Sequence, residues 1–195
     1  TSGEGGVCFT NNKIFNDRIL ALRTHGIYKN NKSRNNTSEK QIWYFDQKLL
    51  GYNFRLTDIQ SALGISQLAR IKKFIAKRKK LSSNYDRFFS KNKNILNLKI
   101  NKINKSSHHL YVIRIINKEK NFRNKLIKYL RQKGIYLNVH YIPVHYHSYF
   151  KKLKYLRKKL QNTEIYFDQA VSLPLYPDLK YEDQKYVVNY INKFL

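Results

Sequence analysis

The chain has 195 residues and a formal net charge of +27 at pH 7, because 39 Lys and Arg side chains stand against 12 Asp and Glu. Hydrophobic residues make up 42% of the sequence, and Phe and Tyr are spread from end to end, which excludes a disordered basic tail as the main description. The apolar runs are far shorter than the roughly 20 residues of a membrane-spanning helix, and a single cysteine, Cys8, excludes an internal disulfide. These features predict a folded, soluble protein of the cytoplasm.

The positive charge has two explanations. A pI of about 10.1 is typical of proteins that bind nucleic acid. Lys, Asn, Ile, Tyr and Phe are all abundant, however, and their codons are the ones richest in A and T. The basic residues are spread along the chain, with dense stretches at 72–80 and 151–159 inside helical patterns. We therefore favour codon bias and solvated helix faces, and keep a basic nucleic-acid-binding module as the alternative.

The first half of the chain contains two predicted helices. The apolar run Val7–Thr10 predicts a short strand. A helix is predicted from about Ile14, with Gly26 at its C-cap, and a polar stretch from 28 to 39 reads as a loop. Thr57 and Gln60 have the spacing of a capping box, so a long helix should start there and continue to about Phe88.

The second half predicts a small α/β domain with helices layered on a sheet. The stretch from 92 to 107 is low in complexity, and we assign no element to it. The predicted elements are strands at 109–116, 135–141 and 171–174 and helices at 122–134, 153–160 and 181–195.

One face of the predicted strand at 135–141 is polar. Strict alternation places Asn138 and His140 together on that face. Two polar side chains on one face of a strand indicate either a structural hydrogen bond or a ligand contact. A histidine that closes the sheet through a hydrogen bond is the simplest structural explanation. His140, His145 and His147 also lie within eight residues, but no Cys or carboxylate joins them and the spacing is not that of a zinc protease. We predict no metal site.

Four separated segments carry a resemblance to a known family. They are Thr1–Gly6, Leu22–Ile27, Leu50–Gly64 and Leu173–Pro177. In this order they resemble the DegT/DnrJ/EryC1/StrS family of sugar aminotransferases, which depend on pyridoxal 5'-phosphate (PLP). The segments 138–145 and 182–186 look most like the branch that acts in pseudaminic acid biosynthesis.

The resemblance implies a fold and a division of the chain. The chain would be the C-terminal part of a PLP-dependent transferase of fold type I, an α/β fold. Residues 1–89 would be the end of the large PLP domain with its connecting helix, and 90–195 the small C-terminal α/β domain. In the family, the lysine that holds the cofactor lies three residues before the position of Thr1. The chain also contains no Met. We therefore expect part of a longer protein, with no catalytic residue of its own and no activity alone.

The resemblance also assigns binding residues. Asn53 would contact the cofactor phosphate or nearby ligand of a partner subunit, as an amide donor can. Asn138, Val139, His140 and Tyr141 would contact the nucleotide-sugar substrate. His25 would lie near the active site, although it could equally stabilise a helix dipole.

The intact enzyme would move an amino group from L-glutamate to the 4-keto carbon of a UDP-linked deoxy-sugar. It would be a homodimer with active sites at the interface. A second alternative is a non-catalytic partner that pairs with a full-length homologue through the same surface.

Overall fold

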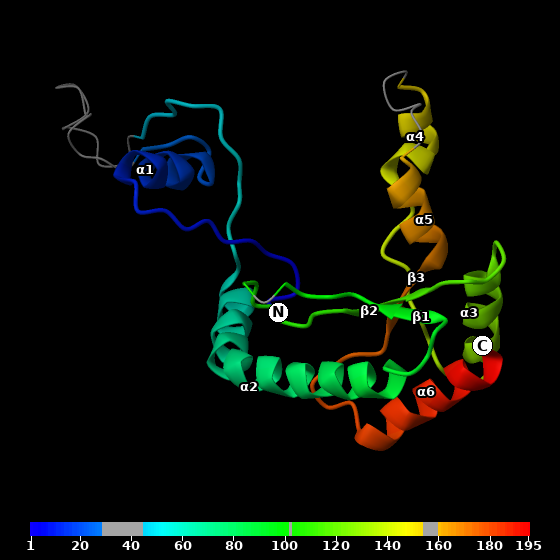
Figure 1. Cartoon of the computed structure of the whole chain (residues 1–195). Helices are drawn as coiled ribbons and strands as arrows, with labels where there is room; N and C mark the ends of the chain where they lie inside the picture. Colours follow the sequence, from blue (N-terminus) through cyan, green and yellow to red (C-terminus); the bar gives the residue numbers. More distant parts are fainter. Residues whose placement is uncertain (29–44, 102, 154–159) are drawn as a thin grey trace. The chain divides into compact units, whose positions relative to one another are not determined.

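The structure is a computed structural model that describes residues 1–28, 45–101, 103–153 and 160–195 (Figure 1). The chain forms two units, Thr1–Arg70 and Ile71–Leu195. The predicted loop lies outside the described residues from position 29 onward, and so do 154–159 of the predicted helix at 153–160. The assignment of 1–89 to a large domain and 90–195 to a small one stays a prediction.

The first unit contains α1 (Lys13–Leu22) and the start of α2 (Asp58–Phe89). Asn12 caps α1, since its side-chain Oδ1 accepts a hydrogen bond of 2.9 Å from the backbone N–H of Ile14. The predicted strand at Val7–Thr10 is wrong: these residues join no strand within the described part of the chain. An apolar run alone cannot form a strand when no neighbouring backbone offers hydrogen bonds.

The start of α2 confirms the predicted capping box. The Thr57 hydroxyl accepts from the N–H of Gln60 at 3.2 Å, and the Gln60 side-chain oxygen accepts from the N–H of Thr57 at 3.1 Å. No helix in the described residues is both long enough and apolar enough to cross a membrane.

The second unit is built on a three-stranded antiparallel sheet in the order β1 (Ile95–Asn97), β2 (Tyr111–Ile115) and β3 (Ala170–Leu173). Ile113 lies opposite Val171, and both are buried. The predicted strands at 109–116 and 171–174 are confirmed in shortened form. Strand β1 was not predicted, because it is three residues long and lies in an Asn- and Lys-rich stretch.

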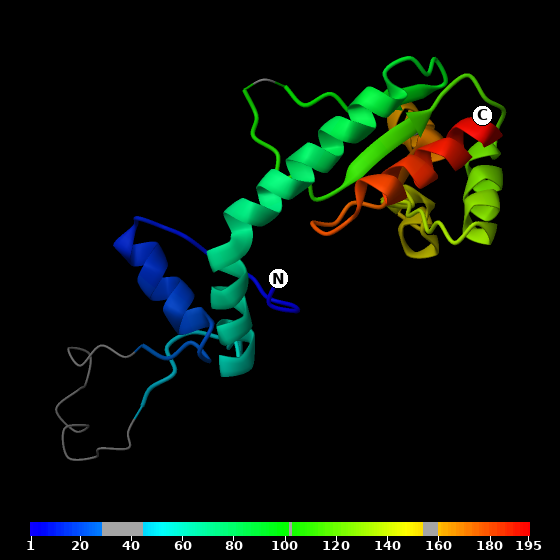
Figure 2. The same cartoon turned by 90° about the horizontal axis from the view of Figure 1, so that it is seen from below.

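Five further helical elements belong to the described residues of this unit. They are α3 (Phe122–Gln132), the 3-10 turn η2 (Val144–Tyr146), α4 (Ser148–Lys151), α5 (Gln161–Gln169) and α6 (Tyr181–Phe194). The last turns of α2 lie beside α6, as Figure 2 shows, and the Phe88 and Tyr181 rings meet at a tilt of 36° with their centroids 5.6 Å apart. The core is a single apolar cluster that includes Tyr85, Leu126 and Ile191.

A buried polar pair joins α2 to α6. The Asn84 side-chain nitrogen donates to Gln184 Oε1 at 3.0 Å, and Gln184 Nε2 donates to the carbonyl oxygen of Leu81 at 2.9 Å. Asn84 Oδ1 accepts from Arg87 at 2.6 Å. The buried amides thus have partners, as burial requires.

The predicted strand at 135–141 is wrong as a strand. The N–H of Ile135 bonds to Leu130 at the end of α3, in a turn around Gly134 with φ of 72°. Only Asn138 exchanges backbone hydrogen bonds with β3, in an isolated bridge to Ser172. The Ile135 N–H therefore closes the end of α3 and is not available for the first hydrogen bond of a strand.

Candidate functional site

His25 and Asn53 lie on two segments that pair in the first unit. The N–H of His25 donates to the carbonyl oxygen of Tyr52 at 2.8 Å, and the N–H of Phe54 donates to that of Arg23 at 3.0 Å. Thr24 and Asn53 form an antiparallel bridge between these bonds. The structure thus brings together two predicted site residues that are separated by 28 positions in the sequence.

Two glycines allow this close pairing. A Cβ atom on Gly51 would lie 2.1 Å from the backbone nitrogen of Gly26, and one on Gly26 would lie 1.8 Å from the carbonyl oxygen of Leu49. Gly26 also has a φ of 78°, in the left-handed region. No other residue fits at either position without moving the backbone.

The Asn53 side chain is exposed and makes no hydrogen bond to any residue that the structure describes. The nearby N–H groups of Thr57 and Gln60 are already satisfied by the capping box. The Asn53 amide is thus one donor that this corner can offer to a ligand. An Asn amide fits a phosphate oxygen, so the residue is compatible with the phosphate group of PLP.

The glycine-rich turn Thr1–Gly6 is held against the start of α2. The Gln60 side-chain nitrogen donates to the carbonyl oxygen of Glu4 at 3.2 Å. A Cβ atom on Gly5 would lie 2.9 Å from the Ser2 hydroxyl oxygen and 3.4 Å from the Leu56 side chain. Gln60 thus serves the helix cap and the turn at once.

The other predicted site residues, Asn138, Val139, His140 and Tyr141, lie in the second unit. His140 Nδ1 is 2.8 Å from the hydroxyl oxygen of Ser172, a buried residue of β3. Backbone hydrogen bonds of 3.2 and 2.8 Å join Asn138 to the same serine. Ser172 therefore orients both polar residues of the predicted pair. The bond at Nδ1 is the hydrogen bond that a purely structural role of His140 requires. The other ring nitrogen, Nε2, has no partner among the described residues.

The remaining two residues of this segment differ in exposure. The Tyr141 side chain is 75% exposed, and its ring meets the His140 ring edge-on with centroids 4.7 Å apart. Val139 is half-buried. The polar and aromatic groups of His140 and Tyr141 can thus reach a ligand, and a substrate contact of Val139 stays a prediction.

His145 binds a carboxylate rather than its neighbouring histidines. Its Nε2 lies 3.2 Å from Glu164 Oε1, and the His145 side chain is only 8% exposed. Desolvation alone would raise the pKa of Glu164, but hydrogen bonds from His145 and from the N–H of Leu160 hold it below its ordinary value. The described residues contain no group of three His, Cys, Asp or Glu side chains placed to share a metal ion.

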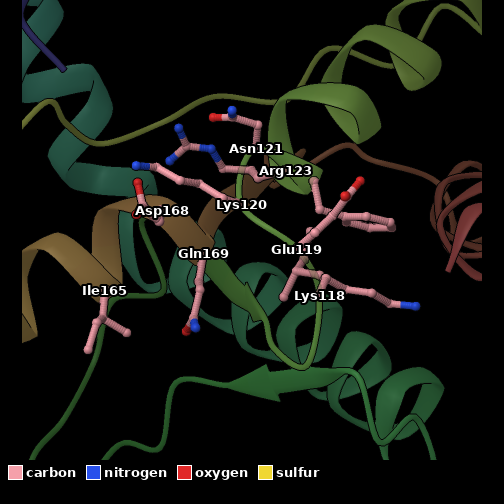
Figure 3. Close-up of a pocket in the computed structure, with 10 residues that line it drawn as sticks. Lys118, Glu119, Lys120, Asn121, Arg123, Ile165, Asp168 and Gln169 are labelled. Carbon is pink, nitrogen blue, oxygen red and sulfur yellow. The ribbon is translucent and has the colours of Figure 1, made fainter.

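A cavity of about 300 Å³ at the start of α3 contains none of the predicted site residues (Figure 3). Arg123 lines it, is buried, and donates to the carbonyl oxygen of Phe167 while its guanidinium covers the Phe167 ring at 4.6 Å. Desolvation lowers the pKa of Arg123. Its donors are engaged with protein groups, so it serves packing between α3 and α5.

The fold is that of the C-terminal part of a PLP-dependent transferase of fold type I, as its similarity to solved sugar aminotransferases shows. The chain belongs to the DegT/DnrJ/EryC1/StrS aminotransferase family, whose profile matches residues 1–192. The family's enzymes depend on PLP, and the chain corresponds to a C-terminal portion of them.

Three relatives illustrate the match. A UDP-4-amino-4,6-dideoxy-N-acetyl-β-L-altrosamine transaminase of Campylobacter jejuni is 36% identical over 187 residues, which are 96% of this chain and 47% of that protein. The structure of Helicobacter pylori PseC, an aminotransferase involved in pseudaminic acid biosynthesis, is similar with a TM-score of 0.80 and 29% identity, covering 95% of this chain and 47% of that one. The structure of Spr1654 of Streptococcus pneumoniae in its PLP form is similar with a TM-score of 0.77 and 26% identity. The match covers 95% of this chain and 45% of that one. The chain therefore spans about half the length of these relatives.

Proposed function

We propose that this chain is the C-terminal portion of a nucleotide-sugar aminotransferase that transfers an amino group from L-glutamate to the 4-keto carbon of a UDP-linked deoxy-sugar. The proposal rests above all on the family match across nearly the whole chain. The C. jejuni relative is a transaminase of a UDP-linked dideoxy-sugar, and H. pylori PseC is involved in pseudaminic acid biosynthesis. The complete enzyme would be a cytoplasmic homodimer with the sugar nucleotide and glutamate as substrates.

In this proposal Asn53 helps to hold the cofactor. Its exposed amide would donate a hydrogen bond to the phosphate of PLP, or to a nearby ligand, in the active site of the partner subunit. PLP would supply the carrier of the amino group between the two substrates. His25, on the paired segment, contributes a polar side chain close to the same ligand. The two glycines keep the two segments at the required separation.

The second group of residues holds the sugar nucleotide. Ser172 fixes the His140 ring through Nδ1, so that Nε2 presents a hydrogen-bonding group in a constant direction. Tyr141 offers an exposed ring and hydroxyl beside it, and Asn138 is held by the same serine. Pre-orientation of this kind lowers the entropy lost when the ligand binds.

The test is a hybrid in which the N-terminal half of the C. jejuni relative precedes Thr1. Loss of a hydrogen bond to a charged ligand group costs about 1.5 to 3 kcal/mol, or roughly ten- to a hundredfold in affinity. Asn53→Ala should weaken PLP retention by this factor, and His140→Ala should raise KM for the sugar nucleotide but not for glutamate. Asn11→Ala and His109→Ala, which alter exposed residues of the same types, are the matched controls. A hybrid that binds PLP and transfers no amino group to any UDP-linked keto-sugar would refute the proposal.

A further inference from the structure

The segment that carries the predicted sugar-nucleotide residues is anchored at two points in the second unit. The first anchor is Ser172, whose hydroxyl oxygen lies 2.8 Å from His140 Nδ1. The second anchor is Glu164, whose Oε1 lies 3.2 Å from His145 Nε2. The span 141–144 runs between these two points. Its path is therefore set by the two anchors together.

The contact between His145 and Glu164 has a defined direction. A carboxylate only accepts hydrogen bonds, so His145 Nε2 carries the proton and donates it. The His145 side chain is 8% exposed and that of Glu164 25% exposed, so water competes little for the bond. Glu164 Oε1 also accepts from the N–H of Leu160 at 3.2 Å, at the start of α5. The carboxylate is thus held by its own helix while it holds the histidine.

Ring packing reinforces the second anchor. The Tyr146 ring meets the Phe167 ring of α5 edge-on, with centroids 6.1 Å apart, and lies 4.5 Å from the His145 ring. The N–H of Tyr146 donates to the carbonyl oxygen of Pro143 at 2.8 Å, which closes the η2 turn. The turn is therefore docked on α5 by a hydrogen bond and by aromatic contact.

Both anchors belong to one continuous piece of the fold, because α5 runs directly into β3 (Figure 1). Strand β3 pairs with β2, and Arg123 of α3 donates to the carbonyl oxygen of Phe167 in α5. The separation of Glu164 from Ser172 is thus fixed by the sheet and by α3. A span held between two fixed points has few conformations to lose when a ligand binds.

We propose that Glu164 is a positioning residue for the sugar-nucleotide site: through His145 it fixes the span 141–144, and so presents Tyr141 beside His140. The Tyr141 side chain is 75% exposed and meets the His140 ring edge-on, so its place depends on the backbone on either side of it. This inference rests on the proposed function, since it takes Tyr141 to contact the sugar nucleotide.

The kinetic test uses the hybrid with the N-terminal half of the C. jejuni relative. The substrate is the keto-sugar whose amination gives UDP-4-amino-4,6-dideoxy-N-acetyl-β-L-altrosamine. Glu164→Ala should raise KM for this sugar nucleotide about tenfold and leave KM for glutamate within about twofold. Glu164→Gln keeps an oxygen that accepts from His145, so KM should rise by less than about threefold.

Two further variants show whether Glu164 acts through the span. In a Tyr141→Ala background, Glu164→Ala should change KM by less than about twofold, because the side chain that it positions is gone. Glu119→Ala is the matched control, since Glu119 is 63% exposed and also pairs with a basic side chain of the second unit, Lys125. Circular dichroism checks that each variant is folded, and Glu164→Gln carries the comparison if Glu164→Ala is not.

Amide hydrogen exchange of the 195-residue chain tests the anchor without the reaction. Glu164→Ala should speed exchange at the N–H of Tyr146 about tenfold, and Glu119→Ala should not. Equal exchange in the two variants would overturn the proposal. So would equal effects on KM for both substrates, or a full effect of Glu164→Ala in the Tyr141→Ala background. Faster exchange together with a hybrid that transfers no amino group supports the anchor and contradicts the proposed function.

Discussion

Replacement of Gln184 by Leu tests the polar connection between α2 and α6. Gln184 is fully buried and makes two hydrogen bonds, one from Asn84 and one to the carbonyl oxygen of Leu81. Leucine has a similar volume but neither donor nor acceptor. Arg87 continues to hold Asn84 Oδ1, so the Asn84 nitrogen stays directed at position 184. The substitution therefore leaves a buried N–H donor without an acceptor.

The expected cost follows from these contacts. An unsatisfied buried donor costs about 1 to 3 kcal/mol, and the lost bond to the Leu81 carbonyl adds about 1 kcal/mol. The added apolar contact of leucine offsets part of this, by about 1 kcal/mol. We expect a net loss of about 1 to 3 kcal/mol in the free energy of unfolding.

Urea denaturation of the full chain, followed by far-ultraviolet circular dichroism, measures this loss. Asn192→Ala is the matched control, because it removes an amide-to-amide hydrogen bond of 2.9 Å from Asn92 that is exposed rather than buried. The control should lose less than about 0.5 kcal/mol. The double variant Asn84→Leu, Gln184→Leu should lose less than the sum of the two single changes, since it removes the unpaired group. A loss below about 0.5 kcal/mol for Gln184→Leu would refute the reasoning.

Three further outcomes are expected. Burial and the hydrogen bond to Asp86 raise the pKa of Tyr111 in the folded chain. The free energy of unfolding should therefore fall as the pH rises above the ordinary tyrosine pKa of about 10. Tyr111→Phe should flatten that fall in a series of melting curves at alkaline pH. The pKa of Glu164 is lowered in the folded chain. Its contribution to the free energy of unfolding is therefore present above the ordinary pKa of about 4.3 and is lost as the pH falls through the lowered pKa. In a series of melting curves at acid pH, Glu164→Gln should remove this contribution to the loss of stability. Gly51→Ala should abolish the pairing with Gly26, seen as faster amide hydrogen exchange in these segments and no change in the sheet.

Some of the fold followed from local sequence signals. The start of α2 was predictable because the cap is made by Thr57 and Gln60 themselves, three residues apart. Strand β3 and helix α6 were predictable from their apolar patterns. Strand β1 was not, since its three residues are recruited by β2 and carry no pattern of their own. The segment at 135–141 alternates like a strand, but its first backbone N–H, that of Ile135, bonds to the carbonyl oxygen of Leu130 at the end of α3. Alternation alone cannot reveal this bond.

The candidate site divides in the same way. Alternation predicted that Asn138 and His140 share one face, and the structure joins both residues to Ser172. No local signal identifies this partner, because Ser172 lies 32 residues after His140. The pairing of the His25 and Asn53 segments likewise depends on two glycines meeting across the chain. Residue types could be read from the sequence, whereas their partners are set by tertiary contacts. The roles in ligand binding stay predictions.

Ser172 belongs to the sheet and to the candidate site at once. Its backbone bonds to Asn138, its position lies opposite Val112 of β2, and its hydroxyl meets His140. A change at position 172 therefore alters how the imidazole is aimed without altering the strand, while a change at 140 leaves a buried hydroxyl without its partner. A single core serine thus couples the stability of the sheet to the orientation of a side chain at the candidate site.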